Sequence, residues 1–433
     1  MNILRKIRPA DIAEVLHSLN DLDRHAVFAA LSRSDQSLAA ASLSELALEE
    51  GVNLLTALAP EEIAVVLQEL PSDDAALFIA QFPEELRQGL LELMKVEAST
   101  DVQELLSFAE GTAGRIMTPD VFSLNEDLTV GESISAIQRT SSEVEMVFYL
   151  YVIDERNHLV GVVSLRQLLL VPPTTPLKKI MSTDVISVRT DTDQEEVARI
   201  VARYNLLGVP VVDAENKLVG LITVDDVIDV IREEATEDIY ALAGVRSDEH
   251  AQSAPGRSVR LRLPWLLVNL ATAVLASSVV HLFEGTIERV VVLATLMPIV
   301  AGMGGNAGTQ TLAVIVRGLA LGEVTWGNTR RILVKEALVG VANGIVNGLV
   351  AAVIIVIWFG FSIKMLLIAL IMAVAMVINL LLAAIGGTLI PVILKRLKAD
   401  PALASTVFVT TITDVGGFLS FLGLAALLLK YLV

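Results

Sequence analysis

One carboxylate lies in a strongly apolar part of this chain. Asp414 belongs to the segment TTITDVGGF, near the middle of an apolar run that covers residues 403–429. A carboxylate at that depth in a bilayer costs about 2.5–3.5 kcal/mol on insertion scales, so it normally faces a water-filled path or a partner. No Lys or Arg lies deep enough in these apolar runs to neutralise it. Asp414 therefore predicts a cation path, and the alternative is a protonated Asp that is hydrogen-bonded within a helix bundle.

A second apolar run contains an unusual polar stretch, LMPIVAGMGGNAGTQT, at residues 296–311. Asn306 and Gln310 lie four residues apart, so their amides share one helix face. Glycines such as Gly305 let another helix, or an ion with its waters, approach the backbone. Amide, carbonyl and carboxylate oxygens form a hard ligand set that suits Mg²⁺ or Ca²⁺, and Mg²⁺ keeps several of its waters. These residue types do not separate Mg²⁺ from Ca²⁺, Mn²⁺ or Co²⁺, and the glycines could serve helix packing alone.

Five long helices must position these groups. Each of five apolar runs is long enough to cross a hydrocarbon core of about 30 Å. They cover residues 264–283, 290–316, 337–361, 365–392 and 403–429. Residues 1–258 contain no such run, so we expect a transmembrane domain over residues 259–433 behind a soluble part. Gly340, Gly344 and Gly348 share one face of the third run, which permits close helix packing.

The charges differ between the two parts. Residues 1–258 carry a net charge of −24 and residues 259–433 carry +6, which together give the −18 of the whole chain. An acidic domain favours cations and disfavours nucleic acid. If the N-terminus is cytoplasmic, the inner segments hold ten Lys and Arg against three outside. This asymmetry predicts a multi-pass protein of the cell (inner) membrane with cytoplasmic N-terminal domains.

Several functional classes have little support. The chain has no Cys, which excludes disulfides and thiolate metal sites. It shows no nucleophile–base pair, phosphate-binding loop or His cluster, so we expect no enzyme. Five helices are few for a closed pathway, which favours a homodimer in the lipid bilayer with a pore between subunits.

The soluble part divides into three regions. Residues 1–113 show helical spacing of apolar residues and a weak internal repeat, which predicts a helical N domain. Two copies of a strand–helix–strand–strand–helix pattern follow at residues 114–175 and 176–235, marked by DERNHLVGVVS and DAENKLVGLIT. These copies resemble a tandem of CBS domains. Residues 236–258 then form an acidic helix and a polar connector to the membrane.

Acidic side chains gather where the second copy meets the connector. The cluster comprises Asp225, Asp226, Asp229, Glu233, Glu234, Glu237 and Asp238. Two carboxylates about 4 Å apart repel by about 4 kcal/mol at an effective dielectric of 20. Bound Mg²⁺ would reverse that sign and favour a compact cytosolic assembly, whereas the plainer interpretation is a solvated acidic helix.

Longer motifs resemble the MgtE family of magnesium channels and transporters. The stretch P-x-x-x-G-x-G-G-N-x-G-x-Q begins at Pro298 and ends at Gln310, and D-P-A-L-x-S begins at Asp400 and precedes Asp414. The resemblance covers nearly the whole chain. It implies a multidomain membrane protein with an all-α helical-repeat N domain, α/β tandem CBS domains, a connecting (plug) helix and a five-helix α transmembrane domain.

The resemblance also implies a function. It suggests a homodimer that conducts Mg²⁺ inward along the second and fifth helices, with Asp414 at the ion-selecting site. Mg²⁺ bound by the acidic cytosolic domains would close the pore. The candidate metal residues are Asp414, Asn306, Gly305, Thr406, Asp400 and the acidic cluster. Alternatives are a broader carrier of Co²⁺ or Mn²⁺, and a CBS-regulated anion transporter, against which an intramembrane Asp argues.

Some members of the family bind ATP at the CBS pair. The resemblance implies Arg166 as a possible ATP contact. Three positions depart from the family pattern: Gln167 replaces an Asp, Thr406 replaces an Asn, and Asn205 replaces an acidic residue.

Overall fold

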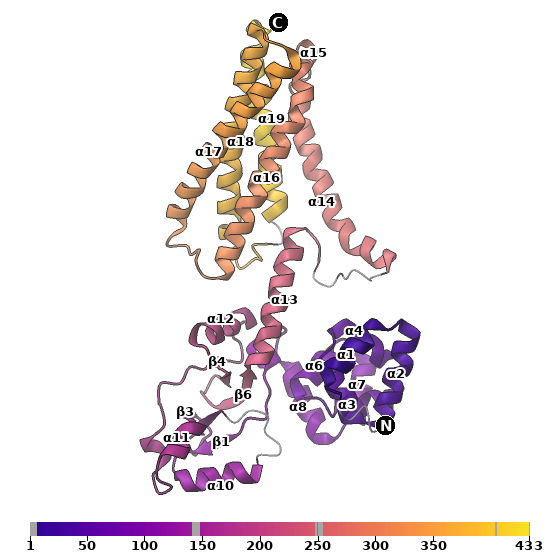
Figure 1. The fold of residues 1–433 in the computed structure, drawn as a ribbon, viewed down its shortest axis with the longest axis vertical. Coiled ribbons are helices and arrows are strands. Elements are labelled where there is room, and N and C mark those ends of the chain that lie inside the picture. Colours follow the sequence, from indigo (N-terminus) through magenta and orange to yellow (C-terminus); the bar gives the residue numbers. More distant parts are fainter. Residues whose placement is uncertain (1–6, 141–147, 247–248, 250–253, 403–404, 433) are drawn as a thin grey trace. The chain divides into compact units, whose positions relative to one another are not determined.

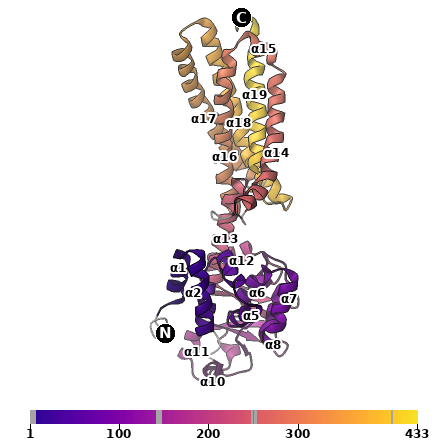
Figure 2. The same ribbon diagram turned by 90° about the vertical axis from the view of Figure 1, so that its right-hand side faces the viewer.

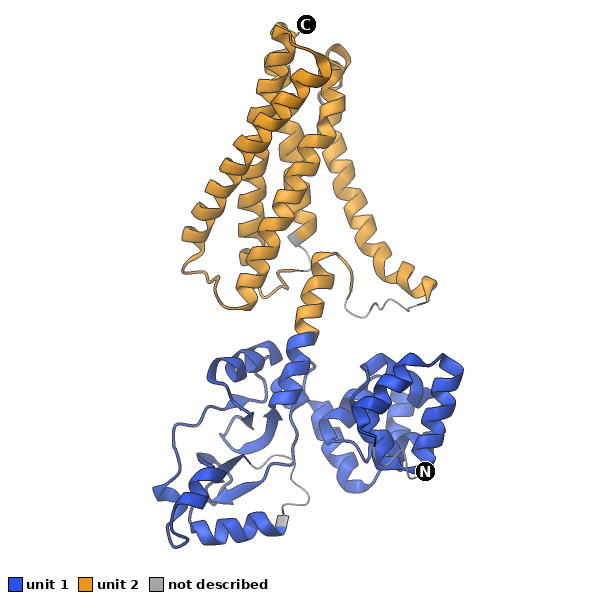
Figure 3. Ribbon diagram, viewed as in Figure 1, with its two compact units in different colours: residues 1–232 blue, residues 233–433 orange. Residues whose placement is uncertain are grey.

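The protein is described from a computed structural model. It describes residues 7–140, 148–246, 249, 254–402 and 405–432. These residues form two compact units, 1–232 and 233–433 (Figure 3).

Short helices build the first part of the first unit (Figure 1). They are α1 (Pro9–Ser18), α2 (Asp21–Ser34), α3 (Gln36–Ser44), α4 (Leu48–Thr56), α5 (Pro60–Leu67), α6 (Ser72–Ala80), α7 (Glu84–Leu93) and α8 (Val96–Ser107), and the four-residue α9 (Ala113–Ile116) follows. Local signals set their limits. Asn20 caps α2 by accepting a hydrogen bond from the Asp23 backbone N–H, 3.1 Å away, as Asn does at helix N-termini. Leu16, Phe28 and Leu67 are fully buried in the shared core.

Two three-stranded sheets follow. The first copy contains β1 (Ser123–Asn125), α10 (Val130–Thr140), β2 (Tyr149–Ile153), β3 (Leu159–Ser164) and α11 (Leu165–Leu170). After a 3-10 turn at Leu177–Lys179, the second contains β4 (Val188–Arg189), α12 (Gln194–Tyr204), β5 (Gly208–Val212), β6 (Leu218–Thr223) and α13 (Val224–Leu242). In both sheets the first two strands pair in parallel and the last two antiparallel. The repeated pattern expected for a CBS tandem is confirmed.

Each copy has a methionine near its start that packs against the sheet of the other copy. A Cβ on Gly220 of the second copy would lie 2.4 Å from the sulfur of Met117, near the start of the first copy. A Cβ on Gly161 of the first copy would lie 2.7 Å from the sulfur of Met181, near the start of the second. The repeated L-V-G motif therefore needs glycine because each methionine packs against the opposite sheet.

Among its described residues, the second unit contains five helices long and apolar enough to cross a membrane. They are α14 (Pro255–His281), α16 (Val292–Ala320), α17 (Thr329–Phe359), α18 (Ile363–Arg396) and α19 (Ser405–Leu427). Two short helices, α15 (Glu284–Arg289) and α20 (Leu429–Leu432), follow α14 and α19. Both views place α14 and α17 on the outer sides of the bundle, with α16, α18 and α19 between them (Figures 1 and 2). The expected fold class is confirmed.

The glycine face of α17 packs directly against α18. A Cβ on Gly344 would lie 2.6 Å from the Val377 Cα, and one on Gly340 would lie 2.7 Å from the Leu380 carbonyl oxygen. Since these neighbours are backbone atoms, they cannot move aside as a flexible side chain could. The predicted close packing of α17 is confirmed.

Candidate cation sites

Asp414 lies on a helix that packs against the glycine-rich stretch. A Cβ on Gly308 of α16 would lie 2.4 Å from Val409 Cγ1 and 3.7 Å from Thr413 Cγ2 on α19. Thr413 is fully buried at this contact, whereas the next residue, Asp414, is half-buried. The carboxylate therefore sits at the edge of the α16–α19 contact.

The side of α16 away from that contact is polar and open. Gly302, Asn306 and Gln310 succeed one another at helical spacing and are exposed in this single copy. A Cβ on Gly305 would meet no heavy atom within 4 Å outside its own helix turn, although its carbonyl oxygen accepts a hydrogen bond from the Thr309 hydroxyl at 2.9 Å. Two helices that pack together thus carry four of the groups predicted from the sequence: Gly305, Asn306, Gln310 and Asp414.

Thr406 connects α19 with the end of α13. Its hydroxyl donates to the Leu242 carbonyl oxygen at 2.9 Å, one of the carbonyls that the end of a helix leaves without an intrahelical donor. Ala241, beside it, packs with Leu312 of α16 and Ala402. The hydroxyl proton of Thr406 is therefore used in a helix contact, while its oxygen keeps lone pairs that a cation could use.

A second carboxylate group lies in the same unit. Partial burial raises the pKa of Glu237 on α13, and repulsion from Glu234 and Asp400 raises it further. Asp400, in the loop between α18 and α19, accepts a hydrogen bond from the Ala402 backbone N–H at 2.8 Å. Negative charges from α13 and from this loop thus repel one another. Asp238 follows Glu237 on α13 and is half-buried.

In the first unit, Asp226 interacts with a carboxylate of the N domain. Burial raises the pKa of Asp226 to about 7, and repulsion from Asp73 contributes, although hydrogen bonds from Thr223 act in the opposite direction. Asp73 Oδ2 accepts from the Thr118 hydroxyl at 2.8 Å. Its Oδ1 is buried and has no hydrogen-bond partner in the described chain. A buried carboxylate oxygen without a donor is costly, and a cation would remove that cost.

The other acidic residues of this cluster are more exposed. Asp225 repels both Asp73 and Asp226, and Asp229 forms an ion pair with Arg232 at 3.3 Å. Among the residues that the structure describes, no three His, Asp or Glu side chains converge as a ready-made metal site. Carboxylates thus repel one another in two groups, Asp73 with Asp225 and Asp226, and Glu237 with Glu234 and Asp400.

Arg166 lines a hollow of about 420 Å³, together with Phe148 and Tyr149 of the first CBS copy and Leu207 of the second. Gln167 is the third residue of α11 and forms a capping box, in which its amide oxygen accepts from the Ser164 backbone N–H at 3.0 Å. Asp226 accepts from the Thr223 backbone N–H at 3.1 Å in the same way. Gln167, which replaces the Asp of the family pattern, therefore still caps the helix. At the third departing position, Asn205 ends α12 with a left-handed backbone at φ +51°, which Asn tolerates.

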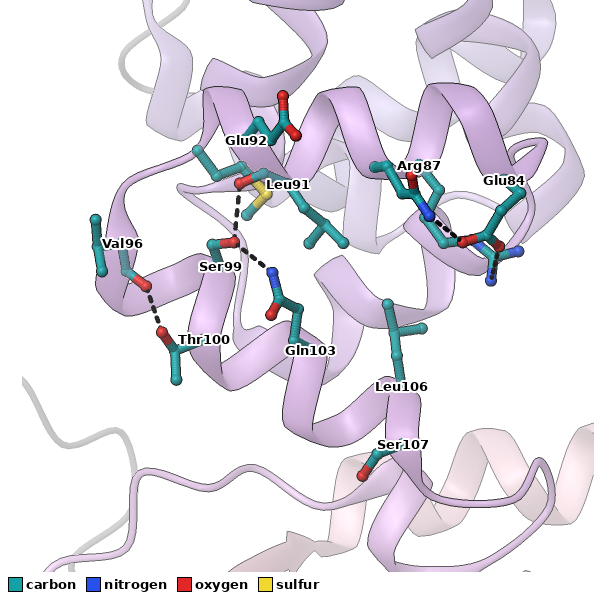
Figure 4. Close-up of a pocket in the computed structure, with 12 residues that line it drawn as sticks. Glu84, Arg87, Leu91, Glu92, Val96, Ser99, Thr100, Gln103, Leu106 and Ser107 are labelled. Carbon is teal, nitrogen blue, oxygen red and sulfur yellow. Dashed lines mark hydrogen bonds and ion pairs between the residues drawn. The ribbon is translucent and has the colours of Figure 1, made fainter.

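A larger hollow of about 680 Å³ lies between α7 and α8 in the N domain (Figure 4). Its central polar groups bind one another. The Ser99 hydroxyl donates to the Leu91 carbonyl oxygen at 2.8 Å and accepts from the Gln103 amide at 3.2 Å. None of the sequence-predicted site residues lines it.

Family models match most of the chain. A "divalent cation transporter" model, MgtE, matches residues 297–424, an "MgtE intracellular N domain" model matches residues 7–111, and a CBS domain model matches residues 113–173 and 177–233. The magnesium transporter MgtE of Thermus thermophilus is 38% identical over 345 residues, which cover 79% of this chain and 76% of that protein. The chain belongs to the MgtE family.

Other members give the same result. The magnesium transporter MgtE of Enterococcus faecalis is 36% identical over 78% of this chain and 73% of its own length. The solved structure of the soluble part of a magnesium transporter matches with a TM-score of 0.50 and 31% identity, over 54% of this chain and 91% of that one. With five candidate spans, this MgtE family member is a multi-pass membrane protein.

Sequence reasoning missed two residues that the structure of this MgtE family member brings forward. Asp73 stands in the first turn of α6, where acidic residues are common, yet only 7% of its surface is accessible. Asn379 stands in an apolar run and is fully buried. Of these two residues, only Asn379 could have been found from the sequence, because an amide inside a membrane helix is itself unusual.

The carboxylates of the first unit predict a pH-dependent stability. The pKa of Asp226 is raised from 3.8 to about 7 in the folded chain, so the folded state binds more protons between these values. The contribution of Asp226 to the free energy of unfolding is therefore largest in acid and falls as the pH rises from about 4 to about 7. Calorimetry of the full chain in detergent, with divalent cations chelated, measures this trend.

Asp73→Asn should weaken that pH dependence, because it removes one source of repulsion and keeps an oxygen for Thr118. At pH 7.5 its unfolding midpoint should rise by about 2–4 °C for each kcal/mol gained. Glu14→Gln, at an exposed position, is the matched control. A lower midpoint for Asp73→Asn, or an unaltered slope with pH, would contradict the proposed repulsion.

Proposed function

We propose that this chain conducts Mg²⁺ across the cell membrane into the cytoplasm, as a homodimer whose N-terminal domains are cytoplasmic. The observation that carries the proposal is the half-buried Asp414 on α19 beside the polar, open face of α16. The relatives that cover most of the chain are named magnesium transporters, which supports the choice of ion.

The open face of α16 supports the dimer. Gly302, Asn306 and Gln310 are exposed in one copy although they lie inside a candidate membrane span. Polar groups that face lipid have no hydrogen-bond partners, so such a face is stable only against protein or water. A second copy placed face to face would cover it and enclose a water-filled path. Asp414 and the amide oxygens would then contact a partly hydrated Mg²⁺.

Asp414→Asn should reduce Mg²⁺ flux into liposomes at least about tenfold, a factor equivalent to about 1.4 kcal/mol, because it removes the carboxylate charge. Asn306→Leu should also reduce flux if the amide contacts the ion path. Ser420→Ala is the control, since the Ser420 hydroxyl only donates to the Gly417 carbonyl oxygen of its own helix. Normal flux and ion preference in Asp414→Asn would refute the pore assignment, and normal flux in Asn306→Leu would leave the glycine stretch a packing role.

The same assay separates the alternatives. Competing Co²⁺ and Mn²⁺ in the external solution would reduce Mg²⁺ flux in proportion to their own passage if the protein is a broader divalent carrier. Flux of anions without divalent cations would instead indicate an anion transporter.

We propose next that intracellular Mg²⁺ closes this path. Asp73 Oδ1 is buried without a partner among the described residues, Asp226 repels Asp73, and Glu237 is opposed by Glu234 and Asp400. Each group is unfavourable without a cation, so Mg²⁺ would stabilise the state in which the carboxylates are close. If that state fits the closed path better, linkage requires Mg²⁺ to favour closure.

Tens of millimolar Mg²⁺ should therefore protect the connector, residues 236–258, from limited proteolysis and lower the flux. The combined variant Asp226→Asn, Asp229→Asn and Glu237→Gln should lose both effects. A variant with Glu85, Glu92 and Glu104 changed to Gln carries the same charge change at exposed N-domain positions and should keep them. Equal responses in the two variants would rule out this feedback.

ATP is the nucleotide that we propose for the hollow beside Arg166. Aromatic and apolar side chains, Phe148, Tyr149 and Leu207, could hold an adenine ring, and Arg166 could meet a phosphate. Charge-assisted contacts of this kind are strong. The amide of Gln167 has one acceptor oxygen where a carboxylate has two, and that oxygen already accepts from the Ser164 backbone N–H.

Calorimetric titration of the purified chain with ATP tests this assignment. Arg166→Ala should weaken binding about tenfold, and Gln167→Asp should strengthen it while keeping the helix cap, because Asp226 caps α13 in the same way. Arg156→Ala, an exposed arginine of the same copy, is the control. Equal affinities across these variants would exclude ATP from this hollow.

A further inference from the structure

Asn379 is a fully buried amide in the middle of α18. Its neighbours in the bundle core are apolar residues such as Met376 and Leu380. Its side-chain N–H₂ donates to the Val300 carbonyl oxygen on α16 at 2.9 Å. Its Oδ1 has no hydrogen-bond partner among the residues that the structure describes. The amide therefore ties α18 to α16 and still carries the cost of one unpaired buried oxygen.

Two glycines make room for this amide. A Cβ on Gly304 of α16 would lie 2.2 Å from Asn379 Nδ2, and a Cβ on Gly417 of α19 would lie 2.7 Å from the same atom. The Gly417 position also meets Val300, whose Cγ1 would be 3.2 Å from that Cβ. Three helices thus meet at one side chain, and neither glycine position tolerates a larger residue while Asn379 stays in place.

The contact lies beside the proposed ion path. Gly304 directly precedes Gly305 and Asn306 on α16, and Gly417 follows Asp414 by about one helical turn on α19. The buried sides of these two helix segments contact Asn379, while their open sides carry the groups proposed to meet the cation. A change in the Asn379 contact would therefore move Asn306 and Asp414 relative to each other.

Packing alone does not account for the amide. A leucine has a similar branched shape without an unpaired oxygen, and its packing is less directional. The hydrogen bond to the Val300 carbonyl, in contrast, fixes the distance between α18 and α16. That carbonyl belongs to the turn just before the glycine stretch.

We infer that Asn379 is a positioning residue, which sets the spacing of α16 and α19 at the level of Asp414 and thereby the ion preference of the path. This inference rests on the proposed function. The amide touches no ion itself; it holds the two helices that do.

Helix spacing can be measured without any ion flux, because the chain contains no Cys. A Cβ at position 308 would lie 2.4 Å from Val409 Cγ1, so the pair Gly308→Cys and Val409→Cys places two sulfurs within bonding reach. Under mild oxidation this pair should cross-link α16 to α19 readily. Adding Asn379→Leu should slow the cross-linking about tenfold.

Thr388→Val is the matched control. Thr388 is a second fully buried polar residue of α18, but its hydroxyl donates at 2.7 Å to the Ala384 carbonyl oxygen of the same helix. It should leave the cross-linking rate unchanged. If Asn379→Leu fails to assemble on gel filtration, Asn379→Ala removes the amide with less volume and should slow cross-linking in the same way.

Ion preference is measured in the cysteine-free chain, as the ratio of Mg²⁺ uptake to Co²⁺ uptake. Asn379→Leu should shift this ratio about tenfold, whereas Thr388→Val should leave it at the wild-type value. If the wild-type chain conducts and Asn379→Leu leaves the cross-linking rate or the uptake ratio unchanged, the inference is overturned while the proposed function stands. A wild-type chain that passes no divalent cation would overturn the proposed function and, with it, the inferred role in ion preference.

Discussion

Three membrane helices come into contact at one level of the bundle, through Asn379, Gly304 and Gly417. In a bilayer there is little hydrophobic driving force between helices, so close backbone approach and interhelical hydrogen bonds hold them together. Asn306, which is exposed, and Asp414, which is half-buried, lie within about one helical turn of this contact on α16 and α19. The proposed cation path therefore depends on small residues whose backbones can be approached, as much as on the groups that would bind the ion.

The remaining helices support this level of the bundle. Gly340 and Gly344 let α17 lie directly on the backbone of α18, which holds α18 from its other side. A Cβ on Gly387 of α18 would lie 3.0 Å from the carbonyl oxygen of Gly308. Gly308 lies one turn beyond Gly304 on α16. The glycines therefore act at successive levels, and each removes a side chain that would separate two helices.

In the soluble part the main electrostatic constraint is repulsion between carboxylates. Asp73 and Asp226 come from the N domain and the second CBS copy, and burial makes both costly to ionise. A fold that holds such a pair together without a cation is destabilised by their repulsion when both are charged. The helix α13 runs from the Asp226 cap to Leu242, whose carbonyl oxygen binds Thr406, so one continuous element carries both Asp226 and Glu237.

The sequence by itself determined the class of the molecule. Apolar run length and the repeated L-V-G motif predicted the five spans and the CBS tandem, because hydrophobic length and local turn chemistry are properties of short segments. The isolated Asp414 and the amides of α16 were visible for the same reason, since a polar residue inside an apolar run is conspicuous without any fold.

Only the tertiary structure decided which distant residues meet. Asp73 looked like an ordinary helix start, and it became a buried partner of Asp226 because the N domain packs on the second CBS copy. Gly304 and Gly417 lie more than a hundred residues apart in sequence, and their shared neighbour Asn379 lies on a third helix. Such contacts depend on how whole helices pack, and packing sums many weak interactions over distant segments that no local pattern records.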